Sequence, residues 1–153
     1  MQDIRDLMTG DHRSCDDRLV AVEQAVLGGD WATARNRFAA FRDAVMAHFN
    51  AEESVLFPLF EQRTGIHRGP TQVMRSEHLQ IRQLLATTET ALEQANGEEY
   101  QGAAETLLIM IQQHNMKEES ILYPMCDQHL ADQRETLLPE LRRQIGRQSE
   151  ETE

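Results

Sequence analysis

The sequence has few of the residues that interrupt helices or cross-link a chain. Its 153 residues include two cysteines, four prolines and eight glycines, and only 5% are aromatic. Cys15 and Cys126 are too few for a disulfide framework, so we expect two reduced thiols. The scarcity of proline, glycine and aromatic residues disfavours a β-sandwich or a β-barrel. We therefore predict a single all-α domain, since this length supports one core rather than two.

Basic residues and long apolar runs are also scarce. The chain has 15 Lys and Arg against 26 Asp and Glu, a formal net charge of −11. This balance argues against a nucleic-acid partner, which requires clustered basic residues. No run approaches the roughly 18 apolar residues of a membrane span, and residues 1–6 lack the features of a signal peptide. These absences predict a cytoplasmic protein with neither a nucleic-acid nor a membrane partner.

Apolar residues instead recur at helical spacing over most of the chain. Two glycine-containing turns, at residues 28–29 and 96–97, end two of the runs, and Asp30 and Pro70 suit the starts of two others. The pattern predicts four long helices, over about residues 3–27, 30–62, 70–97 and 98–128.

A shorter fifth helix is predicted over residues 131–145, where Pro139 should kink the helix or shift its start. The acidic end, residues 148–153, should be disordered. Four long helices with short links favour an up-down-up-down four-helix bundle. We expect this bundle over residues 1–130 and an additional C-terminal helix of the same domain over residues 131–147.

One motif occurs twice. The segment from His48 to Pro58 returns as the segment from His114 to Pro124, and each copy begins His-x-x-x-Glu-Glu-Ser and ends with an apolar residue, Leu, an aromatic residue and Pro. The prolines free a backbone carbonyl about one turn earlier, so we expect a kink in each copy. The repeat predicts two similar helical hairpins related by a pseudo-twofold axis.

Four histidines fall at one level of this bundle. The offset of 66 residues that relates the two motifs also relates an upstream histidine in each half. Counting residues from the turns between the helices places all four histidines within a few ångströms of the same level, because each helical residue rises about 1.5 Å. These residues are His12, His48, His78 and His114.

Two glutamates complete the candidate site. Glu52 follows His48 by four residues and Glu118 follows His114 by four, which puts each carboxylate on the same helix face as its histidine. A single buried histidine is usually a core residue, but four of them with two carboxylates would carry a large desolvation cost without a cation. The set fits two divalent metals bridged by carboxylate, where iron is the usual choice and manganese or zinc can take the same donors.

These motifs resemble the bacterial type of the hemerythrin-like family, also called the HHE cation-binding domain, over about residues 1–130. The Glu-x-x-His pattern of ferritin-like di-iron bundles occurs nowhere in the chain. The resemblance implies two irons that share an oxo or hydroxo bridge. It implies that His12 and His48 bind one iron and that His78 and His114 bind the other. The carboxylates of Glu52 and Glu118 would bridge the two irons.

One departure from the oxygen-carrying members concerns Met74. Those members have a further histidine one turn before the helix-three ligand, where this chain has Met74, and Met8 holds the matching place in the first half. We do not count a thioether as an iron ligand here. The resemblance then implies an open position on each iron, which favours nitric oxide or a bridging peroxide over reversible oxygen carriage. In this respect the chain resembles bacterial members linked to nitric oxide defence and to repair of iron–sulfur clusters.

We therefore expect a di-iron protein that binds or reacts with nitric oxide, dioxygen or peroxide in nitrosative or oxidative stress defence. Nitric oxide reductase or peroxidase-like turnover is one form of this function. A sensor or store that binds oxygen or nitric oxide without turnover is an alternative, and an iron buffer that holds and releases metal is another.

The neighbours of the six candidate ligands are expected to play no part in the site. Phe57 and Tyr123 occupy equivalent places and should share a packing role, and Cys15 should be a small apolar core residue rather than part of an access path. We expect the adjacent carboxylates to be solvated surface groups, with a hydrogen bond to a ligand imidazole as the alternative. They are Asp11, Glu53, Glu77 and Glu119.

Overall fold

The structure is a computed structural model that describes the backbone of residues 2–151 and the side chains of residues 2–146. All of its regular elements in this range are helical, which confirms the predicted all-α class. The α-helices are α1 (Ile4–Leu27), α2 (Trp31–Ala51), α3 (Phe57–Thr64), α4 (Pro70–Glu93), α5 (Gly97–Lys117), α6 (Tyr123–His129) and α7 (Arg134–Glu151).

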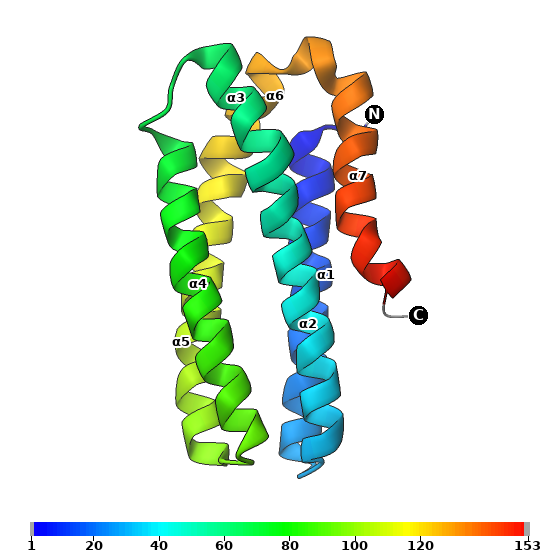
Figure 1. Cartoon of the computed structure of the whole chain (residues 1–153), viewed down its shortest axis with the longest axis vertical. Coiled ribbons are helices and arrows are strands. Elements are labelled where there is room, and N and C mark those ends of the chain that lie inside the picture. Colours follow the sequence, from blue (N-terminus) through cyan, green and yellow to red (C-terminus); the bar gives the residue numbers. More distant parts are fainter. Residues whose placement is uncertain (1, 152–153) are drawn as a thin grey trace.

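The helices form an up-down-up-down bundle with one additional helix, as predicted (Figure 1). α1 pairs with α2 and α4 pairs with α5, so each half of the sequence repeat makes one hairpin. α3 and α6 continue the lines of α2 and α5 past the ends of α4 and α1. α7 returns along the bundle and packs mainly against α2 and, to a smaller extent, against α1.

The repeat extends into the two turns at the far end of the hairpins. Gly29 and Ala95 are 66 residues apart, and both have left-handed backbone conformations, with φ of 72° and 51°. The next residues, Asp30 and Asn96, cap α2 and α5 by accepting a hydrogen bond from a backbone N–H of the first turn. α4 therefore ends at Glu93, sooner than the predicted end near residue 97, because Ala95 already turns the chain.

A π-helical turn interrupts each of the two helices that carry the repeated motif. The turns cover Glu52–Leu56 and Glu118–Leu122, and each is followed by an α-helix with proline as its second residue, Pro58 or Pro124. In the first turn the N–H of Phe57 donates to the carbonyl five residues earlier. The proline lacks the N–H that would close the next α-helical turn, so the kinks predicted from the sequence take the form of π turns.

The interior consists of two apolar clusters with a polar layer between them. The first fills the half of the bundle near the interhelical turns, and the second lies under α3, α6 and α7. Met8 and Met74 belong to the second cluster. The largest buried members of the first cluster include Phe38, Phe41, Leu85 and Tyr100, and those of the second include Phe57, Phe60, Tyr123 and Leu141.

The C-terminal helix differs in extent from the prediction. α7 begins at Arg134 after a 3₁₀ turn, passes Pro139 without interruption, and continues to Glu151, beyond the expected end at residue 147. Of the tail expected to be disordered, residues 148–151 belong to this helix, and residues 152–153 lie outside the described residues. No helix in the described part of the chain is long and apolar enough to cross a membrane.

Candidate metal centre

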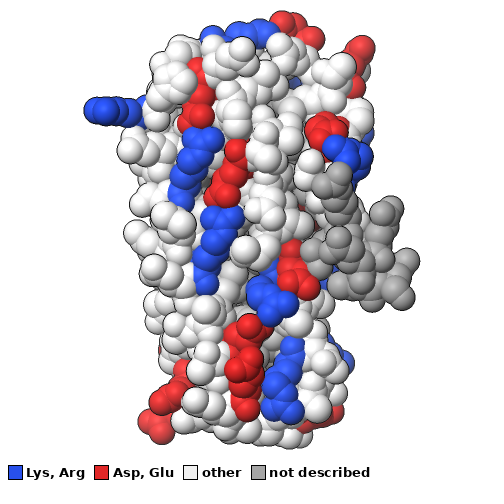
Figure 2. Space-filling model, viewed as in Figure 1, with Lys and Arg blue, Asp and Glu red and all other residues white. Residues whose placement is uncertain are grey.

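The polar layer consists of the six residues singled out in the sequence. The four histidines come from α1, α2, α4 and α5, and the two glutamates come from the first residue of each π turn. All six are buried: the most exposed is His12, with 5% of its surface accessible, and Glu52 and Glu118 have none. Residue counting along the helices therefore placed the histidines correctly at one level. On the face drawn in Figure 2, acidic and basic side chains of the described residues alternate and form no continuous basic surface.

The inner nitrogen of each imidazole lies close to a carboxylate oxygen. His78 Nε2 is 3.1 Å from Glu52 Oε1, and His48 Nε2 is 3.6 Å from Glu52 Oε2. His12 Nε2 and His114 Nε2 are each 3.2 Å from Glu118 Oε1. Potential ligand atoms of Glu52, His78, His114 and Glu118 lie within 4.8 Å of one another, and so do those of His12, His48 and Glu118. Glu118 takes part in both groups.

Four buried atoms in this layer make no hydrogen bond of normal geometry among the described residues, although His78 Nε2 and Glu52 Oε1 lie 3.1 Å apart. They are Glu52 Oε1, His78 Nε2, His114 Nε2 and Glu118 Oε2. A buried polar atom without a partner costs about 1–3 kcal/mol, and such atoms are rare in folded proteins. Because these atoms are nitrogen and carboxylate donors that face one another, a divalent cation fits the site and would satisfy them.

The outer nitrogens of the imidazoles correct one prediction. The four carboxylates expected to be solvated each lie against the Nδ1 atom of a histidine, at 2.7 to 2.9 Å. Such contacts fix the imidazole tautomer with its Nε2 lone pair turned inward and make the ring a stronger ligand. The pairs are Asp11 with His48, Glu53 with His78, Glu77 with His114, and Glu119 with His12.

These pairs cross from helix to helix and form a closed ring. α1 supplies the carboxylate that contacts the histidine of α2, and the first π turn supplies the one that contacts the histidine of α4. α4 in turn supplies the carboxylate for the histidine of α5, and the second π turn supplies the one for the histidine of α1. Neighbouring residues on a helix point about 100° apart, so Asp11 turns toward α2 while His12 points inward. The sequence carried a signal for this, because the four carboxylates obey the same offset of 66 residues as the histidines.

Tyr123 is a second correction. Its hydroxyl donates to Glu52 Oε2 at 2.8 Å and to Glu118 Oε1 at 3.0 Å, and it lies within 3.2 Å of the Nε2 atoms of His12 and His48. In an unbroken α-helix, residues five apart point in different directions. The extra residue of the π turn brings Tyr123 round to the side of Glu118. A role in packing alone, predicted from its equivalence with Phe57, is therefore wrong for Tyr123.

The two halves of the layer are covered differently. Phe49 stacks on the ring of His78, with centroids 3.8 Å apart and planes inclined by 14°. Its repeat equivalent is the smaller Asn115, and both residues line a small cavity. The smaller residue leaves room on one side that an aromatic ring fills on the other.

This cavity has a volume of about 20 Å³ for the centre of a water-sized sphere and is predominantly apolar. It adjoins His12, His48 and His114, and Cys15 forms part of its wall. Cys15 is buried, as is Cys126, and both thiols are free, as predicted. The prediction that Cys15 is only a core residue is thus incomplete, since it also borders the space beside the histidines.

Charges within the layer shift the pKa values of its members. Burial lowers the pKa of His48, but the carboxylates of Glu52 and Asp11 more than offset it and raise the pKa well above its usual value. Burial opposes ionisation of Glu52, but the surrounding imidazoles hold its pKa well below the usual range. The pKa of His114 is raised to about 9, where Glu118 outweighs burial. The protein without metal therefore holds protons that a bound cation would displace.

A four-helix bundle with a buried layer of histidines and carboxylates defines a class of metal-binding helical proteins. The sequence model of the hemerythrin HHE cation-binding domain matches residues 3–126, and the chain belongs to this family. The family predicted from the repeated motifs is thereby confirmed. Comparisons with curated proteins and with solved structures gave no significant match.

Proposed function

We propose that the protein binds two iron ions in the buried layer and that this centre binds or reacts with a small molecule such as nitric oxide, dioxygen or peroxide. The observation that carries the proposal is the set of unpartnered, buried nitrogen and carboxylate atoms that face one another. Imidazole and carboxylate donors suit iron, and manganese or zinc can take the same donors.

The residues divide between two cation positions. His12 and His48 would hold one ion, and His78 and His114 would hold the other, with both carboxylates shared between them. The presence of Glu118 in both groups of ligand atoms supports this sharing. When bound, iron would supply redox chemistry and a place for a small ligand. The shared carboxylates are Glu52 and Glu118.

The cavity supports a small ligand beside His12 and His48. A cavity needs about 10–15 Å³ by this measure to hold one water molecule, so about 20 Å³ admits an occupant of diatomic size. Phe49 stacks on His78 and borders the cavity, and its smaller repeat equivalent Asn115 borders the same cavity. We therefore propose a single preferred ligand position, in place of the two equal ones that the sequence suggested.

Tyr123 supplies a protonated hydroxyl within the layer, although it is not among the residues that line the cavity. Burial and the carboxylates of Glu52 and Glu118 raise the pKa of its phenol well above the usual value, so the hydroxyl stays protonated. Its oxygen lies 3.1 Å from His48 Nε2 and 3.2 Å from His12 Nε2. The phenol can thus donate a hydrogen bond to a ligand held between the metals beside these histidines.

Reversible binding without turnover is the second candidate. The apolar lining of the cavity favours it, because apolar walls stabilise a neutral diatomic and offer few groups for proton transfer. Release of iron as a buffer is less compatible with the structure, since every candidate ligand is buried. The enclosed layer favours a retained centre.

Metal analysis and absorption spectroscopy of the protein purified from its own host test the proposal. Two irons per chain with the bands of an oxo-bridged ferric pair are expected, and a single zinc per chain would contradict it. The reduced protein is then exposed to nitric oxide, hydrogen peroxide or dioxygen. Formation of nitrous oxide or consumption of peroxide indicates an enzyme, whereas a stable adduct that reverses on removal of the gas indicates a sensor or store.

A further inference from the structure

The carboxylates that hold the imidazoles differ in whether a cation neutralises them. Glu53, which contacts His78, accepts two hydrogen bonds from the guanidinium of Arg82, at 3.0 and 2.8 Å. Glu77, which contacts His114, forms an ion pair with Lys117. Each carboxylate behind this pair of histidines therefore has a basic partner.

The carboxylates behind His12 and His48 have no such partners among the described residues. The positions equivalent to Arg82 and Lys117 are Asp16 and Ala51. Among the described side chains, neither carboxylate behind His12 and His48 is paired with a lysine or arginine. Asp16 is exposed and adds a further negative charge that acts on both His12 and Glu119.

Arginines in that half are placed differently. Arg5 and Arg13 line a surface depression together with Glu119, but neither forms an ion pair with it in the described structure. Arg18 acts on the thiol of Cys15, and Arg142 lines a second depression together with Asp11 without an ion pair to it in the described structure. Arg5 and Arg13 are exposed, so their charges are more strongly screened than those of a bonded pair.

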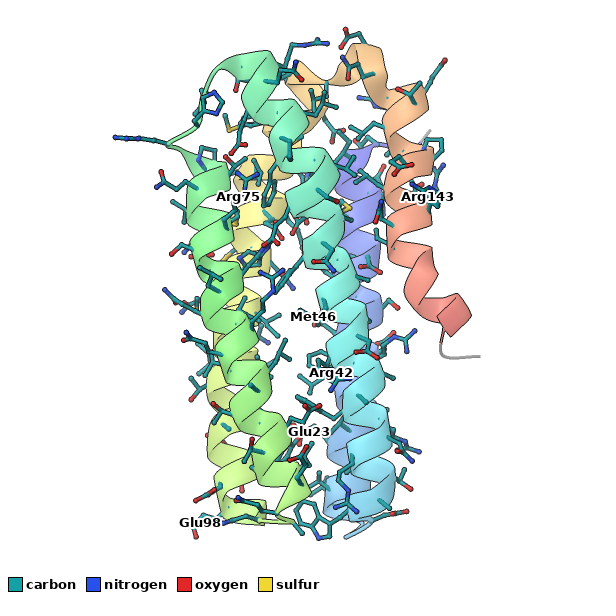
Figure 3. All side chains as sticks on the ribbon, in the orientation of Figure 1. Glu23, Arg42, Met46, Arg75, Glu98 and Arg143 are labelled. Carbon is teal, nitrogen blue, oxygen red and sulfur yellow. The ribbon has the colours of Figure 1, made fainter. Side chains whose placement is uncertain are left out.

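Basic residues of α4 also approach the two aromatic rings that stack against His78. The guanidinium of Arg82 lies 5.4 Å from the centroid of Phe49, the ring that stacks on His78. Arg75, labelled in Figure 3, lies 5.4 Å from the centroid of Phe57, whose ring also stacks against His78. The basic groups thus surround the side of the layer that contains His78.

We propose that the two cation positions are electrostatically unequal, such that the position of His12 and His48 binds its ion more tightly and prefers the higher ionic charge. A carboxylate bonded to an imidazole strengthens the ligand, and a cation bonded to that carboxylate weakens this effect. Arg82 and Lys117 act as positioning residues, through Glu53 and Glu77. The inference rests on the proposed metal centre and concerns the order in which its positions fill.

A competing effect acts in the opposite sense. The two hydrogen bonds from Arg82 fix Glu53, and a fixed carboxylate orients His78 for binding. Arg82→Gln separates the effects, because glutamine retains a hydrogen-bond donor and removes the charge. Arg82→Lys retains the charge with a different geometry. If charge dominates, Arg82→Gln increases the metal affinity of the position of His78, and Arg82→Lys leaves that affinity nearly unchanged.

Cobalt(II) binding to single-position variants tests the inference. His114→Gln impairs the position of His78 and His114, and His48→Gln impairs the position of His12 and His48. Binding of cobalt(II) to the remaining position of each variant is followed by its visible absorption. Changes around metal ligands alter affinity by about 10–100-fold, so we expect His114→Gln to bind at least about tenfold more tightly than His48→Gln. Adding Arg82→Gln to His48→Gln should raise its affinity, and adding Asp16→Arg to His114→Gln should lower its affinity.

The full chain provides a second measurement that does not depend on loss of a ligand. Its cobalt(II) titration should show two steps, and Arg82→Gln should bring the steps closer together. Arg63→Gln is the matched charge control, since Arg63 pairs with Asp132 at the surface. Equal affinities of the two single-position variants, or the reverse order, overturn the inference. Failure of the full chain to bind two ions overturns the metal centre itself.

Discussion

The hydroxyl of Tyr123 lies 2.8 Å from Glu52 Oε2, and thereby joins the second half of the repeat to the motif of the first. Its counterpart Phe57 has no hydroxyl with which to return the contact. The candidate ligands of the two halves thus match each other, but the phenol that contacts them comes from the second half alone.

Tyr123→Phe should destabilise the protein without metal. The substitution leaves Glu52 Oε2 without its hydroxyl donor, and an unsatisfied buried acceptor costs about 1–3 kcal/mol. We expect a loss of this size in the free energy of unfolding, measured by denaturant titration in the presence of a chelator. Tyr100→Phe, which removes a hydroxyl bonded to Glu23 outside the centre, should cost less. Equal stability of Tyr123→Phe and the parent chain would show that the hydroxyl does not hold the carboxylates.

Removal of either shared carboxylate should abolish binding of two metals. We expect Glu52→Ala and Glu118→Ala each to bind at most one ion per chain, because each carboxylate lies beside histidines of both halves. Metal content after loading and desalting provides the measurement. Glu98→Ala at the surface is the control. Two ions per chain in either variant would show that the carboxylates do not bridge.

Met74→His should leave the metal content unchanged and alter the adduct with dioxygen or nitric oxide. Met74 is buried with 3% of its surface exposed and lies one turn before His78, so an imidazole there adds a potential donor to that side. The absorption spectrum of the adduct is compared with that of the parent protein and of Met8→His. An identical spectrum for Met74→His would mean that this position does not face the centre.

Asn115→Phe should fill the cavity and reduce ligand binding. It reproduces the residue that covers His78 in the other half, so the small-molecule adduct should form more slowly or more weakly while two metals still bind. Cys15→Ala enlarges the same space and is the opposing control. Stopped-flow absorption after mixing with nitric oxide measures both. Unchanged binding in Asn115→Phe would place the ligand elsewhere.

Stability without metal should fall as the pH rises above neutrality. The pKa of His114 is raised to about 9 in the folded protein, against about 6.5 for an unfolded chain. A raised pKa contributes stability that is fully present below about pH 6.5 and is lost as the pH rises through about 9. The Tm in chelator should therefore decrease across this interval. Metal affinity should increase across it, because the imidazole must lose its proton to bind.

His114→Gln provides the control for this pH dependence, since it removes one of the titrating groups. Its Tm should fall less steeply over the same interval than that of the parent chain. A Tm that rises with pH in the parent protein would contradict the sign of the shift.

Much of the fold and the six central residues could be predicted because the repeat carries both. Helical spacing located the long helices, and His12 and His78 followed from the offset between the motifs. The predicted end of α4 was too late because a left-handed alanine such as Ala95 is unusual, and Gly97, two residues further on, gave the stronger signal.

The partners of the ligands were missed for a different reason. Asp11 is next to His12 in sequence but bonds to a histidine on another helix, so its role depends on how the helices are rotated against each other. Tyr123 reaches the centre through a π turn, which helical periodicity does not anticipate. The offset of 66 residues contained a signal in both cases. The carboxylates recur at this offset, whereas Tyr123 is replaced by Phe57.

The closed ring of imidazole–carboxylate contacts also bears on how the bundle moves. Each of the four helical columns gives one contact and receives one, so no column can shift at this level without breaking two. The ring acts as a belt around the polar layer, which holds a layer of buried charge together where apolar packing is interrupted. Local opening of the bundle should therefore begin at its ends and not extend past this ring of contacts.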